Sequence, residues 1–155
     1  VVDKLEREPH IHAVGPEGLP EEKVQALRAY GMDMGIAFQL IDDCLDYVAE
    51  EAEFGKSVGT DLGEGKITLP LIHAMIAATP EERRRVEEVV TAEDVAEGDL
   101  AYVMEVIARY DGIGSARRCA EKRVARAKAR LTCFPDCKER EALEGIADYV
   151  LVRRR

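Results

Sequence analysis

The sequence predicts an all-α fold. Apolar residues recur at helical spacing through most of the 155 residues, and no stretch alternates apolar and polar residues as a β-strand does. Proline, glycine and capping residues divide these periodic stretches into segments of ordinary helix length. The chain is long enough for one domain with a hydrophobic core and short for two.

The first predicted helix covers residues 20–52. Residues 1–19 before it are polar and broken by Pro and Gly, so we expect an irregular segment there and a helical domain over residues 20–155. Pro20 followed by two glutamates suits the first turn of a helix. Apolar residues lie on nearly every side of the second half of this helix, which predicts that it is buried.

Five shorter helices are expected after a glycine-rich loop at residues 55–65. The second is expected over residues 66–78, and Thr79 with the two glutamates after Pro80 is an N-cap signal for the third. A looser capping signal at residues 91–94 predicts a fourth that ends near Gly112. A basic amphipathic helix follows over residues 114–132, and the last covers residues 138–152. The basic helix over residues 114–132 carries one apolar stripe, formed by Ala116, Ala120, Val124, Ala127 and Leu131.

The helix at residues 20–52 is too apolar to be covered by the few helices that follow it. We therefore expect it to pack against a partner, or to belong to the second half of a larger helical domain.

Charge and hydropathy exclude two classes of partner. The formal net charge is -9, whereas nucleic-acid binding needs a basic face, and the acidic balance leaves room for a divalent cation. The longest apolar runs, such as residues 69–72, are far shorter than a membrane span. The first ten residues have no signal-peptide pattern, so we expect a cytoplasmic protein.

The four cysteines are scattered without a secretory context, which favours free thiols over disulfides. Cys133 and Cys137 with His10 and His12 are a conceivable zinc site. Their spacing is unusual for zinc, and Pro135 between the thiols favours a turn between two helices.

Asp42, Asp43 and Asp46 stand in the middle of the first predicted helix. Aspartate is a poor helix former, and like charges this close repel each other. A solvated acidic patch would explain them, and so would a metal site, because carboxylate oxygens on a rigid element suit Mg²⁺. Gln39, three and four residues before the pair, can orient a carboxylate or a metal-bound water.

Lys56 and Lys66 each follow a glycine in the loop after these aspartates. Two ammonium groups and loop amides beside carboxylates are typical of a Mg²⁺-diphosphate site, although Gly-Lys pairs are also frequent in ordinary loops. Gly55-Lys56-Ser57 is not a P-loop, because position 50 is not glycine and no strand precedes it.

Residues 30–70 closely resemble the second aspartate-rich region of trans-type polyprenyl diphosphate synthases. That family's pattern is Phe-Gln-x-x-Asp-Asp-x-x-Asp, then Gly-Lys-x-x-Gly-x-Asp, then Gly-Lys-x-Thr-Leu-Pro. The ending FPDCKEREALEGIADYVLVRRR is similar to the long-chain bacterial members that make octaprenyl or decaprenyl diphosphate. The resemblance covers about residues 15–155. The pattern is met by Phe38, Gln39, Asp42, Asp43, Asp46, Gly55, Lys56, Gly59, Asp61, Gly65, Lys66, Thr68, Leu69 and Pro70.

The resemblance implies an isoprenoid-synthase helical bundle, a homodimer, and condensation of isopentenyl diphosphate with an allylic diphosphate. By residue, the three aspartates would ligate Mg²⁺, and Lys56 and Lys66 would hold the diphosphate. Gln39 would bind the metal or substrate directly or orient a group that does. Phe38 would line the path of the carbocation or sit in the core. The candidate catalytic residues are Asp42, Asp43 and Lys56.

Two departures from the family pattern suggest that the chain is the C-terminal half of such a synthase. The family's first aspartate-rich motif has no counterpart in residues 1–37, and Lys4 is followed by leucine where a Lys-Thr pair is expected. The isolated chain is then expected to be inactive. The alternative is a non-catalytic helical module or small subunit that pairs with a full-length synthase. Terpene cyclases fit less well, because their second metal motif uses Asn, Ser and Glu.

Overall fold

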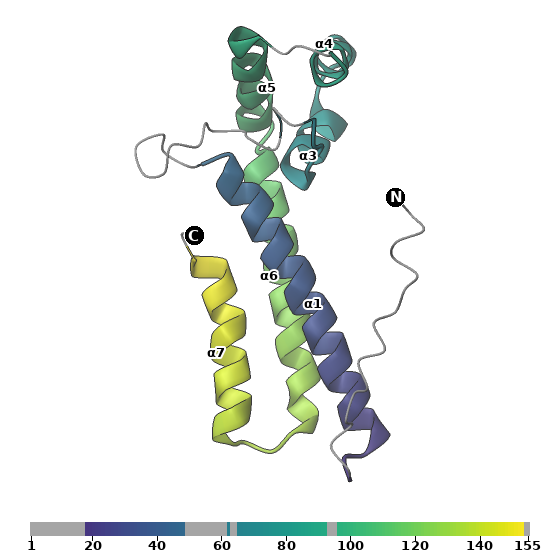
Figure 1. Cartoon of the computed structure of the whole chain (residues 1–155), viewed down its shortest axis with the longest axis vertical. Coiled ribbons are helices and arrows are strands. Elements are labelled where there is room, and N and C mark those ends of the chain that lie inside the picture. Colours follow the sequence, from purple (N-terminus) through teal and green to yellow (C-terminus); the bar gives the residue numbers. More distant parts are fainter. Residues whose placement is uncertain (1–17, 49–61, 63–64, 93–95, 154–155) are drawn as a thin grey trace.

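The computed structural model describes residues 18–48, 62, 65–92 and 96–153. These residues form helices joined by short turns, and no strand occurs among them, so the all-α prediction is confirmed (Figure 1). No helix in this part of the chain is long and apolar enough to cross a membrane. The helices are α1 (Glu21–Asp46), α3 (Leu69–Ala77), α4 (Pro80–Val90), α5 (Glu97–Arg109), α6 (Gly112–Arg130) and α7 (Lys138–Val152), with a 3₁₀ turn, η2 (Leu131–Cys133).

The local signals in the sequence predict most helix boundaries correctly. α7 begins and ends as expected, and Thr79 and Glu82 form the reciprocal capping box that opens α4. The prediction that a helix begins at residues 91–94 is wrong, because Thr91 is the C-cap of α4 and α5 begins after Ala96. α1 ends earlier than predicted, at Asp46, with a turn at Tyr47 and Val48; residues 49–52 lie outside the described part.

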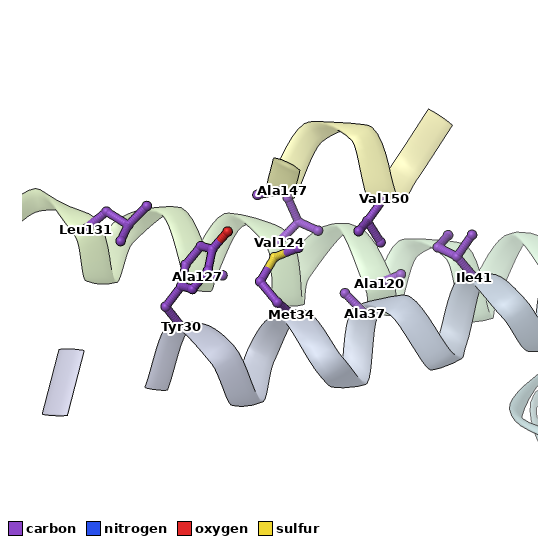
Figure 2. Packing of buried hydrophobic residues seen from close by; sticks show 10 residues of the cluster. All are labelled: Tyr30, Met34, Ala37, Ile41, Ala120, Val124, Ala127, Leu131, Ala147 and Val150. Carbon is purple, nitrogen blue, oxygen red and sulfur yellow. The ribbon is translucent and has the colours of Figure 1, made fainter. Parts of the chain in front are cut away.

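The main packing interface lies between α1 and α6, which run side by side for most of their length, with α7 lying along them (Figure 1). Alanines at several contact positions let the helix backbones approach closely. The predicted stripe on α6 is buried as expected, and Figure 2 shows α7 covering the same cluster through Ala147 and Val150. The buried cluster consists of Tyr30, Met34, Ala37, Ile41, Ala120, Val124, Ala127, Leu131, Ala147 and Val150.

A second apolar cluster joins α3, α4 and α5 beyond one end of the three long helices. It includes Tyr47, the residue directly after α1, so the end of α1 is tied to this group. Gly112, the first residue of α6, lets the backbones of α6 and α3 approach closely, because a Cβ there would lie 2.3 Å from the carbonyl oxygen of Pro70. The start of α3 is therefore held against the start of α6.

The prediction that the second half of α1 is buried is wrong for one side of the helix. Met32 is 70% exposed and Phe38 is 47% exposed, and Ile36 is also exposed. The reason is that α6 and α7 cover only the side that carries Met34, Ala37 and Ile41. The expectation that the following helices cannot cover α1 is confirmed for the described residues.

Candidate metal and diphosphate site

The three aspartates lie at the C-terminal end of α1, within its last two turns. Asp42 is exposed, and Asp43 and Asp46 are partly buried. Gln39, one turn earlier, donates a hydrogen bond from Nε2 to Oδ1 of Asp43 at 2.7 Å. A side chain amide that holds a carboxylate in this way restricts its rotamer, which agrees with the orienting role predicted for Gln39.

Asp42 is held by a residue that is distant in sequence. The Arg153 guanidinium forms an ion pair with Oδ1 of Asp42 through Nη2. The same guanidinium lies over the ring of Phe38, with its central carbon 3.8 Å from the ring centroid. Because Phe38 and Asp42 are four residues apart on a helix, they share a face, and Arg153 covers both. One of the two roles predicted for Phe38 was a place in the core, and its exposure shows that this role is wrong.

Contacts between α7 and α6 explain why Arg153 reaches α1. Arg117 of α6 donates a hydrogen bond from Nη2 to the carbonyl oxygen of Leu151 at 2.6 Å, near the end of α7. Lys128 of α6 forms an ion pair with Asp148 at 2.9 Å, and Val150 is buried against both long helices. These contacts hold the C-terminal end of α7 against α6, and Arg153 is the residue directly after that end.

The segment before α3 is tied to the same end of α1. The hydroxyl of Tyr47, one residue after Asp46, is hydrogen-bonded to Oγ1 of Thr68 at 2.8 Å. Lys66 is exposed and precedes Thr68 by two residues, so it belongs to the segment that this hydrogen bond ties to the end of α1. Lys56, the other predicted diphosphate ligand, lies outside the described residues.

The donor set fits a metal that shares its coordination sphere with a substrate. Within the described ranges, no three His, Cys, Asp or Glu side chains converge as a complete metal site. Mg²⁺ usually takes one or two carboxylates and fills its other positions with waters and phosphate oxygens. Asp42 and Asp43 are adjacent carboxylates, each held by a partner side chain through Oδ1. They fit that requirement.

All four cysteines are free thiols, as predicted. Cys44 is buried on the opposite side of α1 from Asp42, and its Sγ lies 3.7 Å from the carbonyl oxygen of Ile113. Burial, followed by the charge of Asp43, raises the pKa of the Cys44 thiol to about 11. This thiol is a packing group. Cys133 and Cys137 flank a turn, and the His10 and His12 of the zinc alternative lie outside the described residues.

Arg153 is the site residue that spacing arguments missed. It lies 111 residues from Asp42, and no local pattern links the two positions. The only signal in the sequence was the similarity of residues 134–155 to the ending of long-chain synthases, which assigned no role to a single arginine.

Comparison with known proteins identifies relatives of one kind. The polyprenyl synthetase family model matches residues 12–107. The octaprenyl diphosphate synthase of Escherichia coli is 40% identical over 142 residues, which cover 89% of this chain and 42% of the relative. The short chain isoprenyl diphosphate synthase of Methanothermobacter thermautotrophicus is 40% identical over 136 residues, covering 88% and 41%.

Solved structures agree with the sequence comparisons. The polyprenyl synthase of Caulobacter crescentus, solved with calcium and isoprenyl diphosphate, superposes with a TM-score of 0.80 at 38% identity. The superposition covers 89% of this chain and 42% of the Caulobacter chain. The decaprenyl diphosphate synthase of Rhodobacter capsulatus gives a TM-score of 0.76 at 36% identity, with coverage of 89% of this chain and 41% of that one. The chain thus spans about two fifths of the length of these relatives.

Proposed function

The chain belongs to the polyprenyl synthetase family, and on that premise we propose that it carries the second aspartate-rich, metal-diphosphate site of a long-chain polyprenyl diphosphate synthase. The reaction is the condensation of isopentenyl diphosphate with an allylic diphosphate. The observation that carries this proposal is the end of α1, where the consecutive residues Asp42 and Asp43 each contact a partner side chain, and where Tyr47 is hydrogen-bonded to Thr68 in the segment that bears Lys66.

The proposed roles follow from the chemistry of each side chain. Asp42 and Asp43 ligate Mg²⁺ together with waters and phosphate oxygens, Asp46 is the third ligand predicted from the sequence, and Lys56 and Lys66 bind the diphosphate. When bound, the divalent cation supplies positive charge that stabilises the departing diphosphate. The ammonium groups add to this where charge develops on the leaving oxygens. Gln39 keeps Asp43 in one orientation, and the exposed face of Phe38 contacts the allylic part of the substrate.

The remaining ligands of a complete synthase are proposed to come from residues outside this sequence. The chain spans 42% of the octaprenyl relative, and residues 1–37 contain no second cluster of aspartates. Assayed alone with radiolabelled isopentenyl diphosphate, the chain should give no prenyl transfer. Robust turnover would contradict this part of the proposal.

Three further properties are proposed from charge, hydropathy and family membership. The protein acts in the cytoplasm, it forms a homodimer when the complete helical bundle is present, and it does not bind nucleic acid. The net charge of -9 supports the last of these. Analytical ultracentrifugation of the complete protein would test the dimer.

Calorimetry with Mg²⁺ and pyrophosphate tests the site directly on this chain. Wild type should bind Mg²⁺ more tightly when pyrophosphate is present, because the two ligands share the metal. Asp42→Asn and Asp43→Asn should each abolish that enhancement. Asp136→Asn, which removes an exposed carboxylate far along the chain, is the matched control and should bind as wild type does. Equal binding by wild type and Asp42→Asn would refute the metal assignment.

Activity provides the second test, in a full-length synthase that contains this sequence. Asp42→Ala or Asp43→Ala there should lower turnover by orders of magnitude, since each removes a direct metal ligand. A near-wild-type rate would contradict the assignment.

A second candidate function is a non-catalytic helical module that pairs with a full-length synthase. The observation in its favour is the apolar surface that the described helices leave exposed, including Met32, Ile76 and Val152. This alternative would be favoured if the tagged chain co-purifies with a longer synthase and if adding the N-terminal half of a synthase as a separate chain produces no turnover. Restoration of turnover by the missing half would favour the catalytic proposal.

A further inference from the structure

Arg153 occupies an enclosed position, although the carboxylate that it pairs with is open to solvent. The Arg153 side chain is 11% exposed, whereas that of Asp42 is 58% exposed. Surface ion pairs between two mobile side chains contribute little to stability or to geometry. Here one partner is immobilised, so the pair constrains the other.

The backbone of Arg153 is tied to α7, and its buried guanidinium contacts Phe38 and Asp42. The Arg153 backbone N–H donates to the carbonyl oxygen of Tyr149 at 3.0 Å, which continues the hydrogen-bonding pattern of α7. The ring of Phe38 lies against one face of the guanidinium. The Nε atom is fully buried and has no hydrogen-bond partner among the described residues. A guanidinium that has lost part of its hydration needs a carboxylate in compensation, and Asp42 is the carboxylate that it contacts.

The contact leaves half of the Asp42 carboxylate available. Arg153 bonds to Oδ1, and within the described part of the chain Oδ2 makes no hydrogen bond. Gln39 holds Asp43 in the same way, through Oδ1. Oδ1 of each of these two consecutive aspartates thus accepts from a side chain, a neutral amide for Asp43 and a guanidinium for Asp42.

We propose that Arg153 is a positioning residue for the metal site: it holds Oδ1 of Asp42 and so presents Oδ2 to the divalent cation. The inference rests on the proposed function, because it requires Asp42 to be a metal ligand. It adds the residue that directly follows α7, outside the aspartate-rich segment, and links the packing of α7 on α6 to the geometry of the site.

A role as a simple charge and a role in positioning Asp42 predict opposite changes in metal affinity when Arg153 is replaced. A cation beside a metal site repels the metal, so removing it should strengthen metal binding. If Arg153 positions Asp42, its removal should weaken metal binding, as loss of a group that orients a ligand does in other metal sites, by about 10-fold to 100-fold. The direction of the change therefore distinguishes the two roles.

The experiment measures Mn²⁺ affinity in the presence of pyrophosphate by calorimetry and by the loss of the free Mn²⁺ electron paramagnetic resonance signal. Arg153→Gln should weaken Mn²⁺ binding about 10-fold. Arg153→Lys keeps the charge and loses the planar fork and the stacking on Phe38, so it should weaken binding as well. Arg84→Gln removes the same charge from an exposed arginine on α4 and should bind as wild type does. Circular dichroism of each variant checks that the helices are retained.

A double-mutant cycle assigns the effect to Asp42. In the Asp42→Asn background, Arg153→Gln should cause no further loss of Mn²⁺ affinity. Tighter or unchanged Mn²⁺ binding by Arg153→Gln would overturn the inference while the metal assignment stands, provided that Asp42→Asn measurably weakens Mn²⁺ binding. Failure of wild type to bind Mn²⁺, or equal binding by wild type and Asp42→Asn, would overturn the metal assignment and the inference together. If Arg153→Gln does not fold, Arg153→Lys decides between these outcomes.

Discussion

Asp33 of α1 and Arg123 of α6, 90 residues apart, form an ion pair in which Oδ1 lies 3.0 Å from Nη1. Asp33 is 3% exposed, the one buried charged residue in the described part of the chain. Arg126 contacts its other oxygen, with Nε 3.4 Å from Oδ2. Two arginines one turn apart on α6 thus enclose a carboxylate of α1, and this fixes how the two helices align along their length.

Removing both arginines should cost more than the sum of the single changes. Either Arg123→Gln or Arg126→Gln leaves Asp33 with one cation, whereas the double variant leaves a buried carboxylate unpaired. We expect a loss of about 3 kcal/mol in the free energy of unfolding for the double variant, at the low end for a broken buried pair because both guanidinium groups are partly exposed. Urea denaturation measures it. Asp33→Asn should recover stability in the double variant, and failure to do so would contradict the explanation.

Glu82 should make the protein less stable as the pH falls below 4.5. Hydrogen bonds from the hydroxyl of Tyr110 and from Thr79, with the nearby Arg109, lower the pKa of Glu82 from 4.5 to about 2. Between these pH values the unfolded chain binds more protons than the folded one, so stability rises with pH over that window. The Glu82 contribution is complete above pH 4.5 and is lost as the pH falls towards 2.

Tyr110→Phe tests this pH dependence, because it removes the largest cause of the lowered pKa. Thermal unfolding followed between pH 2 and 6 should show a smaller slope for the variant than for wild type. Equal slopes in the two proteins would mean that Glu82 is not the titrating group.

Gly112→Ala should destabilise the contact between α6 and α3. The added methyl group would lie 2.3 Å from the carbonyl oxygen of Pro70, so the helices must move apart, at a cost of about 1 to 3 kcal/mol. Gly145→Ala on α7 is the control, since a Cβ there has open space around it. That variant should gain about 1 kcal/mol from higher helix propensity. Urea denaturation would compare the two.

Gln39→Leu should weaken metal binding while the fold is retained. The variant keeps a side chain of similar size on an exposed position and removes the 2.7 Å hydrogen bond to Asp43. The expected loss of Mn²⁺ affinity in the presence of pyrophosphate is about 10-fold. Gln25→Leu, which removes a similar exposed hydrogen bond near the start of α1, should bind as wild type does. Equal affinities of Gln39→Leu and wild type would exclude an orienting role for Gln39.

Local physics explains why the sequence predicted so much of the secondary structure. The capping box at Thr79, the buried stripe of α6 and both ends of α7 depend on residues within a few turns of one another, and such patterns are visible in the chain. The Gln39 and Asp43 pair is of the same kind, because a four-residue separation on a helix places the two side chains in contact. The end of α1 and the start of α5 were misplaced where the local signals were weak.

By itself, then, the sequence determined the helical elements, the cluster of aspartates on one helix and the family to which the chain belongs. Only the tertiary structure decided that Phe38 is exposed, that Asp33 lies between two arginines of α6, and that Arg153 holds Asp42. The physical reason is that these relationships depend on how α1, α6 and α7 pack. That packing results from many weak apolar contacts summed over the whole interface, and no single spacing in the chain encodes it.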